Sequence, residues 1–267
     1  TWYRRTVFSG GCSDISPSVK ITVTPLPIAS IQYPGTPYCS NAGLVSVSLT
    51  GSPGGTYSSS PVGLSMNTED GEVNTIASVP GIYTVTYTIV ASGGCSQVTA
   101  TTTIEIKSDG VWTGTFSTDW NNTGNWECNI LPTLSTNVII PGSLVNYPTL
   151  STGLTGKAKN ITIQNGASLT VTGNTLQIAG DVSNSGIFTA GNGTIEMAGN
   201  SLQNITANLF ADNTILNLTI NNPSGVNLLG TLNISGVLKA QTGNLNTGGF
   251  LTLLSSSTQT ALIDGSG

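Results

Sequence analysis

Short runs in which apolar and polar residues alternate are the feature that most constrains the fold of this chain. In residues 82–90 (IYTVTYTIV), the large side chains of Tyr83, Val85, Tyr87 and Ile89 are separated by threonines. A period of two places these side chains on one face of an extended strand. Similar runs recur between glycine, asparagine and proline turns, and only 7% of the residues are charged. Because strong helix formers are scarce, the sequence predicts an all-β protein with many turns.

The composition argues against several classes of function. The chain has no histidine, which excludes Ser-His-Asp and Cys-His catalytic groups and histidine-ligated metals. A formal net charge of -5 does not suit a nucleic-acid binder, which needs a basic face. No apolar run approaches the roughly 18 residues of a membrane-spanning helix. We therefore expect no cofactor, no metal, no nucleic-acid partner and no membrane-spanning segment.

The pentapeptide SGGCS occurs at 9–13 and again at 92–96, and β-type runs flank both copies. This repeat predicts two hairpins with a cysteine in the second arm. We interpret residues 1–25 as the C-terminal strands of a preceding Ig-like repeat, and residues 26–107 as a complete Ig-like β-sandwich. Tyr83 is either the tyrosine corner of such a domain or an ordinary core tyrosine. The chain opens without a signal-peptide pattern, so we expect it to belong to a longer polypeptide.

Four cysteines favour an oxidising compartment. Cys39 and Cys95 lie near the start and the last hairpin of the complete unit, and we predict a structural disulfide between them. The alternative is a pair of free buried thiols. Cys12 is equivalent to Cys95, so its partner is expected in the preceding unit, whereas Cys128 has no counterpart in the repeat. No C-x-x-C pair exists, which argues against a zinc or redox site.

Residues 135–267 have a different pattern, with shorter strands and more frequent asparagine and glycine turns. NITIQN at 160–165 resembles NLTINN at 217–222, and TLQIAG at 175–180 resembles TLNISG at 231–236. We interpret this as an internal duplication within a parallel β-helix (β-solenoid) of about seven turns. A second β-sandwich is the alternative. In the solenoid, four isoleucines should be buried at matching points: Ile163, Ile178, Ile220 and Ile234.

A tryptophan-rich segment, residues 108–134, precedes the solenoid. It contains Trp112, Trp120 and Trp126, and we predict that their indoles cap the open core of the first turn. The alternative is a glycan contact, because aromatic faces stack on sugar rings.

Carboxylates are the remaining candidates for catalysis. The solenoid carries Asp181, Glu196, Asp212 and Asp264 on different expected turns, and no two of them have the spacing of an acid pair. The cluster Glu69-Asp70-Gly71-Glu72 is interpreted as a solvated turn rather than a calcium site. We therefore expect no enzymatic activity.

Several motifs together resemble a known family. C-x-N-A-G at 39–43, GGTYSSSPVGLS at 54–65 and PGIYTVTY at 80–87 resemble the Ig-like (PKD-like) repeats of large Bacteroidota surface proteins. The segment W-T-G-x-x-S-x-D-W-N-x-x-G-N-W, followed by P-T-x-x-x-x-V-I-I-P, is similar to the start of β-helical modules in the same proteins. The resemblance implies export by the type IX secretion machinery and display at the cell surface, where some members act as adhesins, including in gliding motility.

Two functional hypotheses follow. The first is a non-catalytic structural and adhesive segment of a large secreted cell-surface protein, whose partners are neighbouring repeats of the same polypeptide and surface glycans. The second is an accessory carbohydrate-binding portion of a secreted polysaccharide-degrading enzyme.

Overall fold

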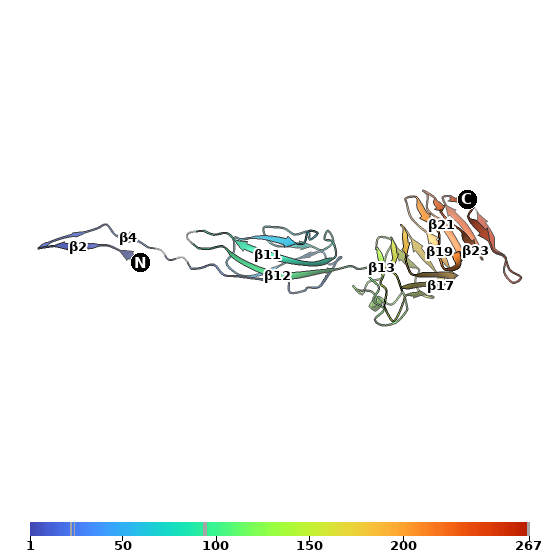
Figure 1. The fold of residues 1–267 in the computed structure, drawn as a ribbon, viewed down its shortest axis with the longest axis horizontal. Helices are drawn as coiled ribbons and strands as arrows, with labels where there is room; N and C mark the ends of the chain where they lie inside the picture. The colour runs from blue at the N-terminus through green and yellow to red at the C-terminus, as the bar shows by residue number, and fades with distance from the viewer. Residues whose placement is uncertain (22, 24, 93–94, 266–267) are drawn as a thin grey trace. The chain divides into compact units, whose positions relative to one another are not determined.

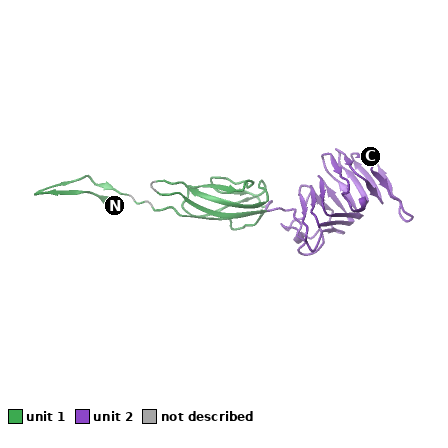
Figure 2. Ribbon diagram, viewed as in Figure 1, with its two compact units in different colours: residues 1–38, 42–106 green, residues 39–41, 107–267 purple. Residues whose placement is uncertain are grey.

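A computed structural model describes residues 1–21, 23, 25–92 and 95–265 of the chain. The protein is all-β and forms two compact units (Figure 2). Unit 1 comprises residues 1–38 and 42–106, and unit 2 comprises residues 39–41 and 107–267. No helix in the described ranges has the length and apolar character needed to cross a membrane.

The first strands of unit 1 form an antiparallel ribbon: β1 (Trp2–Tyr3), β2 (Thr6–Ser9), β3 (Cys12–Ile15) and β4 (Val19–Lys20). In the β2–β3 hairpin Thr6 pairs with Ile15 and Ser9 pairs with Cys12. The second SGGCS copy has the same register, since Ile89 pairs with Val98 and Ser92 bridges to Cys95. The two central glycines of that copy lie outside the described residues. Both copies are therefore hairpins, as the repeat predicts.

Residues 26–107 contain two long strands and several short ones. The strands are β5 (Ala29–Gln32), β6 (Tyr38–Cys39), β7 (Leu44–Val45), β8 (Ser48–Gly51), β9 (Thr56–Ser60), β10 (Val73–Asn74), β11 (Gly81–Ile89) and β12 (Val98–Lys107). They form a four-stranded sheet in the order β6-β12-β11-β9 and two pairs, β5-β8 and β7-β10. The alternation along β11 buries Tyr83, Val85 and Tyr87 against Ile104 and Ile106 of β12.

Buried tyrosines connect this core to the loops above it. The hydroxyl of Tyr33 donates to the Gly71 carbonyl at 2.6 Å, and that of Tyr83 donates to the Val79 carbonyl at 2.6 Å. Burial raises the pKa of Tyr33 far above its usual value, and the neighbouring Tyr57 adds to the rise. The neutral phenol is therefore the form that the folded unit requires.

Unit 2 contains a β-solenoid of about six turns, rather than the seven expected from the sequence. The strands of successive solenoid turns pair in parallel, and Figure 1 shows β17, β19, β21 and β23 stacked side by side. Parallel pairing of successive turns excludes the alternative of a second antiparallel sandwich. One three-stranded sheet contains β13 (Val138–Ile140), β16 (Ile161–Ile163) and β18 (Val182–Asn184). A second contains β20 (Gln203–Ile205), β22 (Val226–Leu228) and β25 (Leu245–Asn246).

The remaining strands form one nine-stranded sheet. They are β14 (Thr149–Leu150), β15 (Gly156–Ala158), β17 (Ser168–Ile178), β19 (Ile187–Met197), β21 (Thr214–Asn221), β23 (Leu232–Ile234), β24 (Val237–Thr242), β26 (Leu251–Leu253) and β27 (Leu262–Gly265). Register shifts interrupt the pairing of β17 with β19 and of β19 with β21. The sheet bends there, so one long strand takes the place of the two short strands found in other turns.

The four isoleucines predicted to be buried are all in the core. Ile163 is 1% exposed, and Ile178, Ile220 and Ile234 are 0% exposed. Their expected placement at matching points is wrong. Ile178 and Ile220 share one inward column through Met197, whereas Ile163 pairs with Ile140 and Asn184 in another sheet. Every face of a solenoid needs the same inward–outward alternation, so similar strand sequences do not identify the face.

The core of unit 2 gives a test of its register. The substitution Ile178→Asp should lower the free energy of unfolding of unit 2 by about 3–5 kcal/mol, because it buries an unpaired carboxylate. As a matched control, Thr189→Asp places the same side chain at an exposed position and should change it by less than about 0.5 kcal/mol. Urea unfolding of both variants makes the comparison, and similar losses of stability would contradict the assigned orientation of these strands.

The tyrosine core of unit 1 predicts sensitivity to alkaline pH. The pKa of Tyr33 is raised on folding, so the unfolded chain loses the phenolic proton first. Its stabilising contribution is complete below the unfolded value of about 10, and falls by about 1.4 kcal/mol per pH unit above it. Unfolding of wild type and Tyr33→Phe followed against pH checks this, since the variant should have a shallower alkaline dependence. Equal slopes would show that Tyr33 is not responsible.

Candidate functional site

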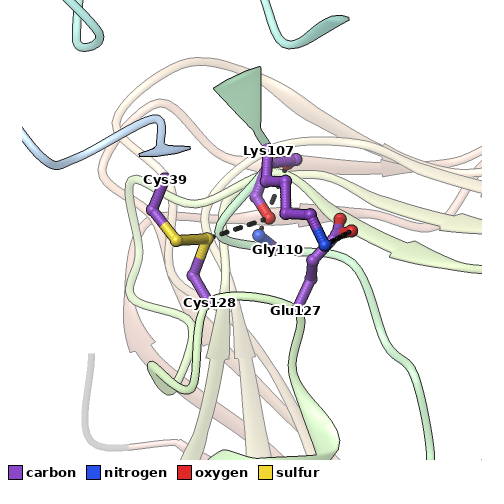
Figure 3. The surroundings of a disulfide bond; sticks show 6 residues. Cys39, Lys107, Gly110, Glu127 and Cys128 are labelled. Carbon is purple, nitrogen blue, oxygen red and sulfur yellow. Dashed lines mark hydrogen bonds and ion pairs between the residues drawn. A yellow bond between two sulfur atoms is a disulfide. The ribbon is translucent and has the colours of Figure 1, made fainter. Parts of the chain in front are cut away.

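The structural disulfide lies in unit 2 and joins Cys39 to Cys128 (Figure 3). Next to it, the Lys107 ammonium group lies 3.3 Å from the Glu127 carboxylate. Cys95 is a free, half-buried thiol and Cys12 is a free, exposed one. The predicted Cys39–Cys95 bond is therefore wrong, although a disulfide is present.

The length of β12 explains why Cys39 does not pair with Cys95. Cys95 lies just before this ten-residue strand, whereas the backbone N–H of Ser40, next to Cys39, donates to the Lys107 carbonyl at its far end. A strand of ten residues spans about 33 Å, and a disulfide needs its Cα atoms within about 7 Å. Cys39 can therefore reach a residue that follows β12 but not one that precedes it. The sequence did contain an indication, because Cys128 follows the strand and had no partner in the repeat.

The three tryptophans at the start of unit 2 form one buried cluster. Trp112, Trp120 and Trp126 are each at most 1% exposed, and the ring of Trp126 meets the other two edge to face at 5.0 and 4.8 Å. The backbone N–H groups of Trp112 and Trp120 donate to Ile139 and Thr149 of the first turn. This is the geometry expected of a cap. Since no indole face is accessible, the alternative of sugar stacking on these rings is wrong.

Asn125 organises the loop that carries these rings. It lies in the 3-10 turn η1 (Thr123–Asn125) and is completely buried. Its side-chain oxygen accepts from the backbone N–H groups of Phe116 and Ser117, and its amide donates to Ser117 Oγ and the Asp119 carbonyl. Sequence reasoning did not identify Asn125 as important. Its position directly before Trp126 was the only signal.

The three indole N–H groups differ in their partners. Those of Trp112 and Trp126 donate to the carbonyls of Asn146 and Trp120 at 2.8 and 2.9 Å. The N–H of Trp120 has no acceptor among the described residues. Every fully buried side-chain nitrogen or oxygen in those same residues has a hydrogen-bond partner. Since the Trp120 N–H has none, this nitrogen is not fully buried. Trp120 also lines a hollow of about 390 Å³ in unit 2 (with Asn121, Leu131, Pro132, Thr133, Leu154, Thr155 and Lys157). We call this hollow the Trp120 pocket.

The parallel register also gathers charged residues that are distant in sequence. Successive outward positions on one face pair in a continuous column: Lys157, Gln177, Glu196, Thr219, Lys239 and Asp264. The carboxylate of Glu196 accepts from the amides of Gln177 at 3.0 Å and Asn221 at 2.8 Å. The sequence placed Glu196 and Asp264 on separate turns but could not show that they share a column. Asp181 and Asp212 are not part of it.

A second outward column on the neighbouring face is almost uncharged. Thr149 pairs with Thr170 and Thr170 with Thr189, and further along the solenoid Thr214 pairs with Asn233. On a third face, the amide of Asn246 donates to Asn227, and that of Asn227 donates to Asn204. The asparagines of this third face, and Asn233 with Thr214, therefore bond to their equivalents in adjacent turns, which stabilises the stack.

The acidic cluster at residues 69–72 has the local contacts of a turn. The carboxylate of Asp70 accepts from the backbone N–H of Glu72, and Asn67 accepts from that of Glu69. Over the described residues, no three His, Cys, Asp or Glu side chains come together in a way that could hold a metal ion.

Comparison with known proteins gives one match. Residues 111–214, which include the three tryptophans and the first turns of the solenoid, match a domain of unknown function, DUF8693. No curated protein and no solved structure matches the chain. The match begins beside Trp112 and ends at residue 214, so it covers the cap and the first part of the solenoid.

The disulfide assignment predicts different effects for two cysteine substitutions. Cys128→Ser should lower the free energy of unfolding by up to about 4.5 kcal/mol, because it opens a ring of 89 residues, and it should make Cys39 reactive to alkylation. Cys95→Ser, the matched control, should do neither. Mass spectrometry of a non-reduced digest identifies the bonded peptides directly. A Cys39–Cys95 peptide would refute the assignment.

Proposed function

We propose that this chain is a non-catalytic structural and adhesive segment of a large secreted protein displayed at the cell surface. In this proposal residues 26–107 are an Ig-like (PKD-like) unit that serves as a stalk, and the solenoid is a spacer and contact surface. Export by the type IX secretion machinery and a role in adhesion or gliding come from the resemblance to Bacteroidota surface proteins. Neighbouring repeats of the same polypeptide and surface glycans are the proposed partners.

Three features of unit 1 support the Ig-like assignment. Its two long strands, β11 and β12, form the centre of an antiparallel sheet over a common core. The hydroxyl of Tyr83 donates to the carbonyl of Val79, four residues upstream, as in a tyrosine corner. The β2–β3 hairpin repeats the register of the β11–β12 hairpin 83 residues earlier in the chain, as tandem domains do.

The disulfide supports a role in bearing tension. Cys39 and Cys128 close a covalent ring that includes residues 42–106 of unit 1. Tension applied to the two ends of the chain passes through the sulfur atoms, so it cannot extend the segment inside the ring. A stalk benefits from this arrangement, because residues 42–106 cannot be extended while the chain is pulled.

The observation that carries the proposal is the arrangement of the outward polar side chains of the solenoid. They lie in columns and bond to one another from turn to turn, as Glu196 does with Gln177 and Asn221. A catalytic site needs acidic groups that converge on one substrate atom with unequal environments. Side chains spread in columns along a stack suit a surface that is repeated and presented, with each contact weak and the total strengthened by repetition.

The second candidate function is an accessory carbohydrate-binding portion of a polysaccharide-degrading enzyme. The Trp120 pocket favours it, since Trp120, whose indole N–H is unpaired among the described residues, and Lys157 line the same hollow. Both functions allow glycan binding, and they differ in the domains with which this chain is joined.

A glycan array tests the non-catalytic proposal. The full chain should bind some glycans without releasing new reducing ends from them. Glu196→Gln and Asp264→Asn remove the two carboxylates of the charged column and should leave this result unchanged. Cleavage of a bound glycan by the wild type, abolished by either variant, would contradict the proposal.

A further inference from the structure

The Trp120 pocket has the features of a binding site whose ligand class neither the comparisons nor the proposed function names. Trp120 is 1% exposed, and its indole N–H has no acceptor in the described part of the chain. A donor without a protein acceptor in a buried side chain costs free energy unless water or a ligand accepts a hydrogen bond from it. Because Trp120 lines a hollow of about 390 Å³, a group bound in that hollow can approach this donor and accept from it.

A second donor lines the same hollow. Lys157 is exposed, and within the described residues its ammonium group has no carboxylate within ion-pair distance. The nearest acidic residue in sequence to Trp120 is Asp119, whose carboxylate accepts from the backbone N–H of Asn121 and so serves its own turn. The pocket therefore presents two donors, one of them charged, and favours a ligand with an anionic acceptor.

The rest of the wall combines apolar surface with hydroxyl groups. Leu154 is 66% exposed, and Leu131 and Pro132 lie beside it in the lining. The amide of Asn121 donates to the carbonyls of Thr152 and Leu154, which holds that loop against the cap and fixes the shape of the pocket. The hydroxyl of Thr155 can donate to and accept from the hydroxyls of a sugar ring, whereas that of Thr133 already bonds to the Thr136 hydroxyl and accepts from the backbone N–H of Ser135.

We infer that the Trp120 pocket binds an acidic sugar, with its carboxylate on the Lys157 ammonium and the Trp120 N–H and its ring against Leu154. A peptide C-terminus offers the same carboxylate but has no ring hydroxyl to pair with that of Thr155. The whole chain has a formal net charge of -5, so it has no general attraction for polyanions and the binding must be local. This inference rests on the proposed contact surface and names the ligand class of one place on it.

The tryptophan signals in a ¹⁵N-labelled full chain provide the readout. Tetragalacturonate is the probe, and a neutral galactose tetramer and the tetrapeptide Ala-Ala-Ala-Leu are the comparisons. The Trp120 N–H signal should shift saturably with tetragalacturonate alone. The signals of Trp112 and Trp126 should stay, since their N–H groups are already bonded, and Trp2, which lies in unit 1, should also stay. The variant Trp120→Phe assigns the signal, because the Trp120 N–H signal is missing from its spectrum. If that variant does not fold, the signal is assigned in the wild type as the one whose N–H exchanges faster with solvent than those of Trp112 and Trp126.

Two lysine variants separate a specific contact from general charge effects. Lys157→Gln should weaken tetragalacturonate binding roughly tenfold, the expected loss for one charge-assisted hydrogen bond. Lys159→Gln removes an equal charge from a neighbouring exposed position that does not line the pocket, and should leave the affinity within about twofold.

Each other outcome overturns the inference. These outcomes are the absence of a saturable Trp120 shift, an equal loss in both lysine variants, an equal response to the neutral tetramer, and a response to the tetrapeptide alone. A negative result leaves the stalk proposal standing, because that rests on the disulfide ring and the stacked turns. Binding accompanied by cleavage of the probe would instead confirm the pocket and refute the non-catalytic function.

Discussion

Parallel backbone pairing between successive turns is the constraint on which unit 2 depends. Each turn contributes strands whose residues pair with those about 20 positions later, as Gln177 does with Glu196 and Thr219 with Lys239. This register sends every second side chain inward, which builds the aliphatic columns, and sends the others outward into polar columns. The cap follows from the same pairing. The first turn of the solenoid has an open N-terminal edge, and the segment that carries Trp112 and Trp120 covers it.

The sequence was sufficient for the strand patterns but not for the contacts between distant strands. Alternation correctly indicated burial of Ile178 and Ile234, because orientation within a strand is a local property. It did not place Ile163 on its own sheet, since each face uses the same pattern. The Cys39–Cys95 prediction failed for a similar reason. The repeat identified a hairpin correctly, but the pairing depended on which end of β12 lies beside Cys39, and that is a long-range property.

The sequence identified the three tryptophans of the capping segment but could not show which of their hydrogen-bonding groups are satisfied. Three indoles close together favoured either a cap or a stacking platform, and the structure buries all three rings. The three rings differ only in the partners of their indole N–H groups: those of Trp112 and Trp126 donate to backbone carbonyls, and that of Trp120 has no acceptor among the described residues. No spacing in the sequence could indicate this difference, because it arises from carbonyl groups that the fold brings to two of the three rings.

A cross-linking experiment tests the register most directly. In a chain with Cys12→Ser and Cys95→Ser, the pair Thr219→Cys and Lys239→Cys should oxidise readily to a disulfide, because these outward residues are direct partners on adjacent strands. The pair Thr219→Cys and Val237→Cys, displaced by two residues along the same strand, should not. Faster cross-linking of the displaced pair would contradict the register and, with it, the outward columns and their charged residues.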